Sequence, residues 1–139
     1  MNPLVIDASV AIKWVIEEPG TPAALALRGR FKLLAPELLV AECANILWKK
    51  VTRDELSAKE ALLSARLLQT AGIELLPTGS LLETATSLAI ELAHPAYDCL
   101  YLTLALEKNC RFVTADERLV RKLKGGRFEE NIFALGQVL

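Results

Sequence analysis

Near its N-terminus the chain reads Leu4-Val5-Ile6-Asp7-Ala8-Ser9-Val10-Ala11. The apolar run before Asp7 is typical of a short buried strand, and the residues that follow are compatible with a helix. One carboxylate therefore stands where a strand is expected to end and a helix to begin. In open α/β sheets, functional sites form beyond the carboxyl ends of the strands, so Asp7 is the first candidate site residue.

The rest of the chain alternates short apolar segments with helical patterns. We expect strands at 3–7, 32–35, 73–76, 111–114 and 131–135. We expect helices at 8–16, 21–28, 36–52, 57–70, 80–93, 97–109 and 116–123, with Thr21 as a cap and with two capping boxes, Ser57 with Glu60 and Ser80 with Glu83. This alternation predicts an α/β fold in which helices cover both faces of a mostly parallel sheet of about five strands.

Composition narrows the class of protein. The 139 residues, 53% of them apolar, are expected to form one domain, 1–139, with a sizeable core. No apolar run is long enough to span a bilayer and no secretory signal is visible, so we expect no membrane association. The three cysteines lack zinc-site or disulfide spacing, which indicates a reducing cytoplasm. A net charge of −1 excludes a strongly basic protein that coats nucleic acid.

Three further acids are expected near Asp7. Asp116 follows the fourth expected strand by two residues, so it shares the edge of Asp7 if the two strands are neighbours. The helix that begins near Asp98 feeds that strand through a short turn and runs antiparallel to it, which returns Asp98 to the same edge. Glu42 lies about 9 Å along the helix that follows the second strand, still near this edge.

Clustered carboxylates point to a metal site. Such groups repel one another and burial raises their pKa, whereas a hard divalent cation reverses both effects. Mg²⁺ prefers oxygen ligands and retains several waters, so a few carboxylates suffice to bind it. One or two such ions can activate water and polarise a phosphodiester, which predicts a metal-dependent nuclease.

Each acid also has a simpler interpretation. Asp7 and Asp116 have the positions of helix caps, and Asp98 can interact with a helix dipole. Glu42 shares one helix face with Asn45 and Lys49, which is compatible with a solvated stripe. These interpretations stay open when only the residue spacing is considered.

Four motifs extend the argument to nearly the whole chain. They are Val5-Ile6-Asp7-Ala8-Ser9-Val10, Pro36-Glu37 leading to Glu42-x-x-Asn45, Tyr97-Asp98-x-x-Tyr101-x-x-x-Ala105, and Phe112-Val113-Thr114-Ala115-Asp116-x-x-Leu119. In this order and spacing the chain resembles the PIN-domain ribonucleases, specifically the VapC-type toxins of prokaryotic type II toxin–antitoxin pairs. The resemblance implies a three-layer PIN-like fold.

The resemblance also implies a Mg²⁺- or Mn²⁺-dependent endoribonuclease that cleaves single-stranded or loop RNA by a metal-activated water. Asp7, Glu42, Asp98 and Asp116 would be the catalytic acids and the metal ligands. Asp7 and Asp98 would bind metal directly, and Glu42 and Asp116 would act partly through water or on a second ion.

Further residues and partners follow from the same resemblance. Ser9 and Thr114 match small hydroxyl residues that line the pocket, and Asn45 would orient Glu42 or a metal-bound water. The expected partners are a small cognate antitoxin, a second copy of the chain in a homodimer, and a higher hetero-oligomer with antitoxin. Apolar helices after residue 21 and around 36–70 are the candidate antitoxin surfaces.

Basic residues near the acids are candidates for RNA backbone contacts. These are Lys13, Arg118, Arg121 and Lys122, although a solvated basic face is an equally good interpretation of them. The single histidine, His94, precedes Pro95 at an expected helix end, so we expect it to cap that helix.

Two other functions are compatible with parts of the pattern. A catalytically silent PIN-like binding module that acts through protein partners would not need four acids. A phosphatase of the haloacid-dehalogenase type would use Asp7 as a nucleophile, but such enzymes typically carry a second Asp where this chain has Ser9.

Overall fold

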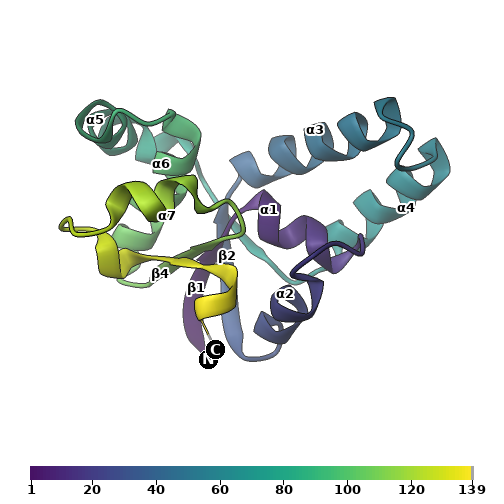
Figure 1. The fold of residues 1–139 in the computed structure, drawn as a ribbon, viewed down its shortest axis with the longest axis horizontal. Helices are drawn as coiled ribbons and strands as arrows, with labels where there is room; N and C mark the ends of the chain where they lie inside the picture. The colour runs from purple at the N-terminus through teal and green to yellow at the C-terminus, as the bar shows by residue number, and fades with distance from the viewer. Residues whose placement is uncertain (139) are drawn as a thin grey trace.

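A five-stranded sheet forms the centre of the computed structural model, which describes residues 1–138 (Figure 1). The strands are β1 (Asn2–Ile6), β2 (Phe31–Pro36), β3 (Glu74–Leu76), β4 (Arg111–Thr114) and β5 (Ile132–Ala134). Their order is β3-β2-β1-β4-β5, and every pairing is parallel. The predicted α/β fold with a mostly parallel sheet of about five strands is therefore confirmed.

Helices cover both faces of this sheet. One layer holds α1 (Ala8–Ala11), α2 (Thr21–Leu27), α3 (Leu38–Thr52) and α4 (Ala58–Gln69), and the other holds α5 (Leu82–Leu92), α6 (Ala96–Glu107) and α7 (Glu117–Leu123) (Figure 1). The chain winds from β1 to β3 in one direction and through β4 to β5 in the other, so right-handed crossovers place the two sets of helices on opposite faces. The α3–α4 pair projects away from the sheet (Figure 1).

The core explains the apolar composition of the central elements. Leu4, Val5 and Ile6 in β1 are fully buried, as expected for a middle strand covered on both faces. Helix α6 is buried on most of its circumference because it packs against β1, β2 and β4 on one side and against α5 on another. Among residues 1–138, no helix combines the length and the apolar character needed to cross a bilayer.

The boundaries of helices α1 and α3 differ from the sequence prediction. The expected helix at 36–52 begins at Leu38, because Pro36 pairs with Leu76 at the end of β2. The helix expected at 8–16 is α-helical only to Ala11 and continues as the 3₁₀ turn η1 (Ile12–Trp14).

Of the two predicted capping boxes, one is present in the structure and the other is not. The capping box at the start of α4 is confirmed, with hydrogen bonds of 3.1 and 2.9 Å between Ser57 and Glu60. The capping box at Ser80 is wrong, because the 3₁₀ turn η2 (Gly79–Leu81) runs directly into α5 and leaves Ser80 inside a helical turn.

Thr21 also does not cap α2. Its hydroxyl instead accepts a 2.9 Å hydrogen bond from the backbone N–H of Glu18. The cap position belongs to Gly20, whose φ of 92° suits a residue without Cβ.

The sheet has one switch point in strand order. The chain leaves β1 towards β2 on one side, whereas β4 lies beside β1 on the other. In such sheets the crevice at the carboxyl ends of the two diverging strands is the usual ligand site. Here that crevice lies beyond Ile6 and Thr114, the last residues of β1 and β4.

Candidate active site

Asp7 is buried at the carboxyl end of β1, with 6% of its surface exposed. Its Oδ1 accepts hydrogen bonds from the hydroxyl of Ser9 at 2.5 Å and from the backbone N–H of Val10 at 3.2 Å. Its Oδ2 accepts a 2.5 Å hydrogen bond from the hydroxyl of Thr114. Asp7 therefore caps α1 and is also held in one orientation by side chains from both neighbouring segments.

The segment after β4 is fixed against the start of α1 by the same two hydroxyl groups. Ser9 Oγ accepts a 2.9 Å hydrogen bond from the backbone N–H of Ala115, and Thr114 Oγ1 accepts one of 3.0 Å from that of Asp116. Because β1 and β4 are parallel neighbours, these contacts place Asp116 at the same edge as Asp7. The expected proximity of these two segments follows from this pairing.

Glu42 lies on α3 and meets α6 through Tyr101. The Tyr101 hydroxyl donates a 2.5 Å hydrogen bond to Glu42 Oε1. The ring of Tyr101 is 1% exposed and stacks on Phe112 with ring centroids 5.6 Å apart, so this hydroxyl has a fixed position. Burial, followed by the hydrogen bond to Glu42, raises the pKa of Tyr101, which keeps the hydroxyl a donor.

Asp98 lies in the first turn of α6 and is paired with His94. Asp98 Oδ2 and His94 Nε2 are 2.7 Å apart. His94 caps the end of the preceding helix as expected, because its backbone N–H bonds the Ala89 carbonyl at 3.1 Å, while its side chain is used for the contact with Asp98. Lys122 reaches the same end and donates a 2.7 Å hydrogen bond to the Ala93 carbonyl.

Asp116 is the cap of α7 and forms an ion pair within its own turn. Its Oδ1 accepts a 3.1 Å hydrogen bond from the backbone N–H of Arg118, and the Arg118 guanidinium bonds both of its carboxylate oxygens. The hydrogen bonds from that side chain hold the pKa of Asp116 below its ordinary value. Arg118, predicted to contact RNA, is thus engaged with one of the four acids.

The ionisation of Asp7 and Glu42 is disfavoured by burial and by the nearby charge of Asp98. Burial raises the pKa of Asp7 to about 6, even though Ser9, Thr114 and Val10 donate to its carboxylate, and the charge of Asp98 adds to the rise. Burial likewise raises the pKa of Glu42, the Tyr101 hydroxyl opposes this rise, and Asp98 again contributes to it. Carboxyl groups that disfavour one another's ionisation in this way are suited to a cation.

The carboxylate oxygens of the four acids are suitable ligands for a hard divalent cation, but in their present conformations these side chains do not converge on one point. Within residues 1–138, no three His, Cys, Asp or Glu side chains converge closely enough to hold a metal ion. Each acid is instead bonded to a different partner, as described above.

The remaining candidate residues have separate surroundings. Asn45 lies one turn after Glu42 on α3, is exposed, and makes no side-chain hydrogen bond to residues 1–138. Lys13 forms an ion pair with Glu18 at 3.2 Å. Arg121 is exposed on α7.

Two residues with direct contacts to the acids were missed as site residues from sequence. Tyr101 stands three positions after Asp98, and His94 stands four positions before it, so the spacing places both on the helix face or turn nearest to Asp98. That spacing was a usable signal for Tyr101. For His94, the four-residue spacing to Asp98 was not used, because the following Pro95 made a helix end the simpler interpretation.

Together, the parallel sheet, its switch point and the carboxylates beyond β1 define an α/β protein with an acidic site at its carboxyl edge. The sequence profile described as "PIN domain" matches residues 4–124. The chain belongs to the PIN domain family.

Individual relatives give the same picture. The chain is 29% identical over 116 residues to VapC ribonuclease Mb0985 of Mycobacterium bovis and to ribonuclease VapC9 of Mycobacterium tuberculosis, covering 84% of this chain and 87% of each relative. The crystal structure of PAE2754 from Pyrobaculum aerophilum superposes with a TM-score of 0.72 at 21% identity, covering 97% of this chain and 90% of that one. At 21% identity, the similarity to PAE2754 concerns the fold alone.

Proposed function

We propose that this chain is a metal-dependent endoribonuclease, the toxin of a toxin–antitoxin pair, which cleaves single-stranded or loop RNA. The observation that carries the proposal is the way hydrogen bonds join the segments that carry the acids at the switch point of the sheet. Thr114 bonds both Asp7 and the backbone of Asp116, and Glu42 bonds Tyr101, one turn after Asp98 on α6. These carboxyl groups come from separate segments, which a structural ion pair or helix cap would not need. The similarity to proteins named VapC ribonucleases supports RNA as the substrate.

Asp7 and Asp98 would bind Mg²⁺ or Mn²⁺ directly, and Glu42 and Asp116 would complete the acidic set. The bound ion would supply an activated water and would offset the charge of the phosphodiester. Ser9 and Thr114 orient Asp7 for this role through their hydrogen bonds to its two oxygens.

Other side chains position the remaining acids. The Tyr101 hydroxyl donates a hydrogen bond to Glu42, and His94 Nε2 contacts one carboxylate oxygen of Asp98. Asn45, exposed one turn beyond Glu42, would face the substrate side of α3 and would orient Glu42 or a nearby water. With a pKa of about 6, Asp7 is mostly ionised at neutral pH and available to a cation.

The direct test compares the wild type with Asp98→Asn on a panel of defined RNAs, with Mg²⁺, Mn²⁺ or EDTA. We expect metal-dependent cuts by the wild type and a loss of at least about 100-fold in the variant. A Lys32→Gln variant at the opposite edge of the sheet is the matched control and should cut normally. Equal cutting by Asp98→Asn would point to a contaminating nuclease and would refute the proposal.

The cognate antitoxin is proposed to bind an apolar groove between α3, α4 and β3. This groove has a volume of about 640 Å³ and is lined chiefly by aliphatic side chains, among them Val40, Leu47 and Leu62. Val40 and Leu62 are 58% and 60% exposed, so a partner would bury substantial apolar surface there. A Leu62→Glu variant should lose the complex with the co-expressed antitoxin and keep its RNA cleavage.

A homodimer is proposed through the opposite helical layer. Leu82 and Ile90 on α5 and Tyr97 on α6 are 68%, 77% and 62% exposed. Leu82→Glu should shift the sedimentation coefficient towards that of a monomer without affecting antitoxin binding. It is therefore the control for Leu62→Glu, which should lose antitoxin binding. A higher hetero-oligomer would form if both surfaces are occupied at once.

We also propose that the protein acts in the cytoplasm. Cys43, Cys99 and Cys110 are all free thiols, and burial raises the pKa of Cys43 to about 12. Unpaired cysteines of this kind are typical of a reducing compartment.

The alternative function is a catalytically silent PIN-like binding module that acts through protein partners. Titration calorimetry with Mn²⁺ separates the two functions. Heat of binding that is lost in Asp7→Asn favours the nuclease, and no binding by the wild type favours the module.

A further inference from the structure

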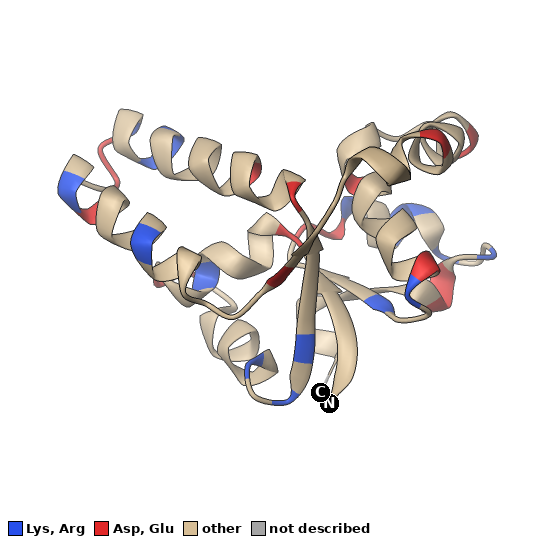
Figure 2. Cartoon of the chain, turned by 180° about the vertical axis from the view of Figure 1, so that it is seen from behind, with Lys and Arg blue, Asp and Glu red and all other residues tan. Residues whose placement is uncertain are grey.

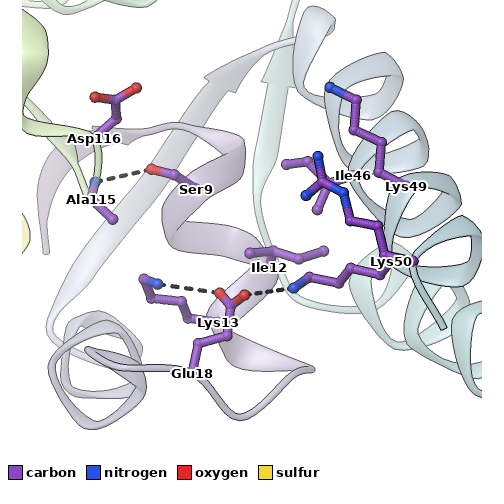
Figure 3. Close-up of a pocket in the computed structure, with 10 residues that line it drawn as sticks. Ser9, Ile12, Lys13, Glu18, Ile46, Lys49, Lys50, Ala115 and Asp116 are labelled. Carbon is purple, nitrogen blue, oxygen red and sulfur yellow. Dashed lines mark hydrogen bonds and ion pairs between the residues drawn. The ribbon is translucent and has the colours of Figure 1, made fainter. Parts of the chain in front are cut away.

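A pocket of about 320 Å³ lies directly beside the acidic site (Figure 3). One end is formed by Ser9, Ala115 and Asp116, which belong to the segments that hold Asp7. The other end is formed by the C-terminal part of α3. The pocket therefore connects the carboxylates with a surface that the proposed nuclease site does not use.

The far end of this pocket is strongly basic. Its cations are Lys13, Lys49, Lys50 and Arg53, and the only carboxylate among its lining residues at that end is Glu18. Because the whole chain has a net charge of −1, this is a local concentration of positive charge. Figure 2 shows basic positions along the α3–α4 pair and acidic positions near the middle of the molecule.

Two of these cations are already committed to Glu18. Lys13 Nζ lies 3.2 Å from Glu18 Oε1, and Lys50 Nζ lies 2.8 Å from Glu18 Oε2. Burial alone would raise the pKa of Glu18, but the two lysines outweigh it and leave this pKa below the ordinary value. This trio forms one wall of the pocket (Figure 3), and Lys50 Nζ also lies 3.9 Å from Glu55 Oε2.

The other two cations are free to bind a ligand. Within residues 1–138, the side chains of Lys49 and Arg53 form no ion pair or hydrogen bond, and both are exposed. They stand four residues apart at the end of α3, so they lie on the same helix face. A lysine beside an arginine suits the oxygens of a phosphate, because the guanidinium can bond two of them at once.

We propose that Lys49 and Arg53 form a subsite for a phosphate of the RNA backbone next to the phosphodiester that is cleaved. This inference rests on the proposed nuclease function and adds the path of the strand, from the acids past Ser9 and Asp116 to the end of α3. RNA is favoured over an acidic protein segment because the pocket opens into the acidic site, through which a bound strand has to pass. Lys49 and Arg53 therefore replace Lys13 and Arg118 as the principal contacts to the RNA backbone, because Lys13 and Arg118 are both engaged with carboxylates.

The test uses a Lys49→Gln/Arg53→Gln double variant and a labelled single-stranded RNA that the wild type cleaves. Arg30→Gln/Lys32→Gln is the matched control, because it removes the same charge at the opposite edge of the sheet. We expect the KM of the first variant to rise about tenfold, with little change in kcat. The slope of log K for RNA binding against log salt should become shallower by about 0.7, the value for one phosphate contact on a single strand.

Charge-conserving changes separate binding from folding. Lys49→Arg/Arg53→Lys should retain most of the RNA affinity, and all variants should bind Mn²⁺ as the wild type does. Cleavage by the double variant equal to that of the matched control would overturn the subsite while leaving the nuclease function intact. Lost affinity for an acidic antitoxin segment, with RNA binding unchanged, would overturn it in favour of a protein partner. No metal-dependent cleavage by the wild type would refute the nuclease function itself, and the subsite with it.

Discussion

The hydroxyl of Thr114, the last residue of β4, donates a 2.5 Å hydrogen bond to Oδ2 of Asp7, the first residue after β1. The same oxygen of Thr114 accepts a bond from the backbone N–H of Asp116. One small side chain thus connects the two strands at the switch point and orients the two acids that follow them. A β-branched residue suits the strand, and its hydroxyl suits the site.

Thr114→Val should test this connection, because valine keeps the shape and removes the hydroxyl. Without this donor the pKa of Asp7 should rise further above about 6, since the hydrogen bond now lowers it. We expect Mn²⁺ affinity at pH 7 to fall by about tenfold and unfolding stability by about 1 kcal/mol. Thr114→Ser should retain both properties, and equal metal affinity in the valine variant would contradict the assigned role.

Asp7 should destabilise the metal-free fold at neutral pH. Its pKa is about 6 in the folded chain and near 3.8 when unfolded, so the folded state binds more protons between these values. Stability therefore falls as the pH rises from about 4 to about 6 and stays reduced above that window. In EDTA, Asp7→Asn should be more stable than the wild type at pH 7 by up to about 3 kcal/mol, and the gap should close near pH 4.

Chemical denaturation at a series of pH values measures this difference. Saturating Mn²⁺ is the internal control, because it should stabilise the wild type and leave the variant nearly unchanged. A constant gap between the two proteins at all pH values would mean that the titration of Asp7 is not its source.

The sequence was sufficient to predict the fold because its signals are local and repeated. Runs such as Leu4-Val5-Ile6 are buried central strands, and their alternation with helices leaves a parallel sheet as the simplest arrangement. Capping was less predictable, because tertiary contacts decide it. Pro36 joins the sheet through its pairing with Leu76, and Ser80 lies inside a 3₁₀ turn.

The acids were predictable as neighbours, but their present partners were not. The direction of the helix that begins near Asp98 can be inferred from the pattern of elements, whereas the strand order that makes β1 and β4 neighbours is known only from the structure. Hydrogen bonds such as that from Tyr101 to Glu42 join residues 59 positions apart, and no local pattern encodes them. The same holds for Glu18, whose link to Lys50 defines the wall of the basic pocket.

Tyr101→Phe should separate positioning from packing. The phenyl ring would keep the stack on Phe112, whereas Glu42 would lose its donor. We expect kcat for RNA cleavage to fall by about tenfold or more, with a loss of about 1 kcal/mol in stability. Tyr97→Phe is the control, because Tyr97 is 62% exposed and should tolerate the change. Unaltered kcat in Tyr101→Phe would remove Tyr101 from the site.

His94 should determine how well Asp98 binds metal. Its Nε2 lies 2.7 Å from one carboxylate oxygen of Asp98, and its side chain is largely buried, so the contact limits the rotation of that carboxylate. His94→Ala should weaken Mn²⁺ binding by about 10- to 100-fold, the usual effect of removing a residue that orients a metal ligand. His94→Gln, which can still donate to Asp98, should recover part of this affinity. Tighter metal binding in His94→Ala would instead show that His94 competes with the ion for Asp98, so calorimetry on the two variants decides between support and competition.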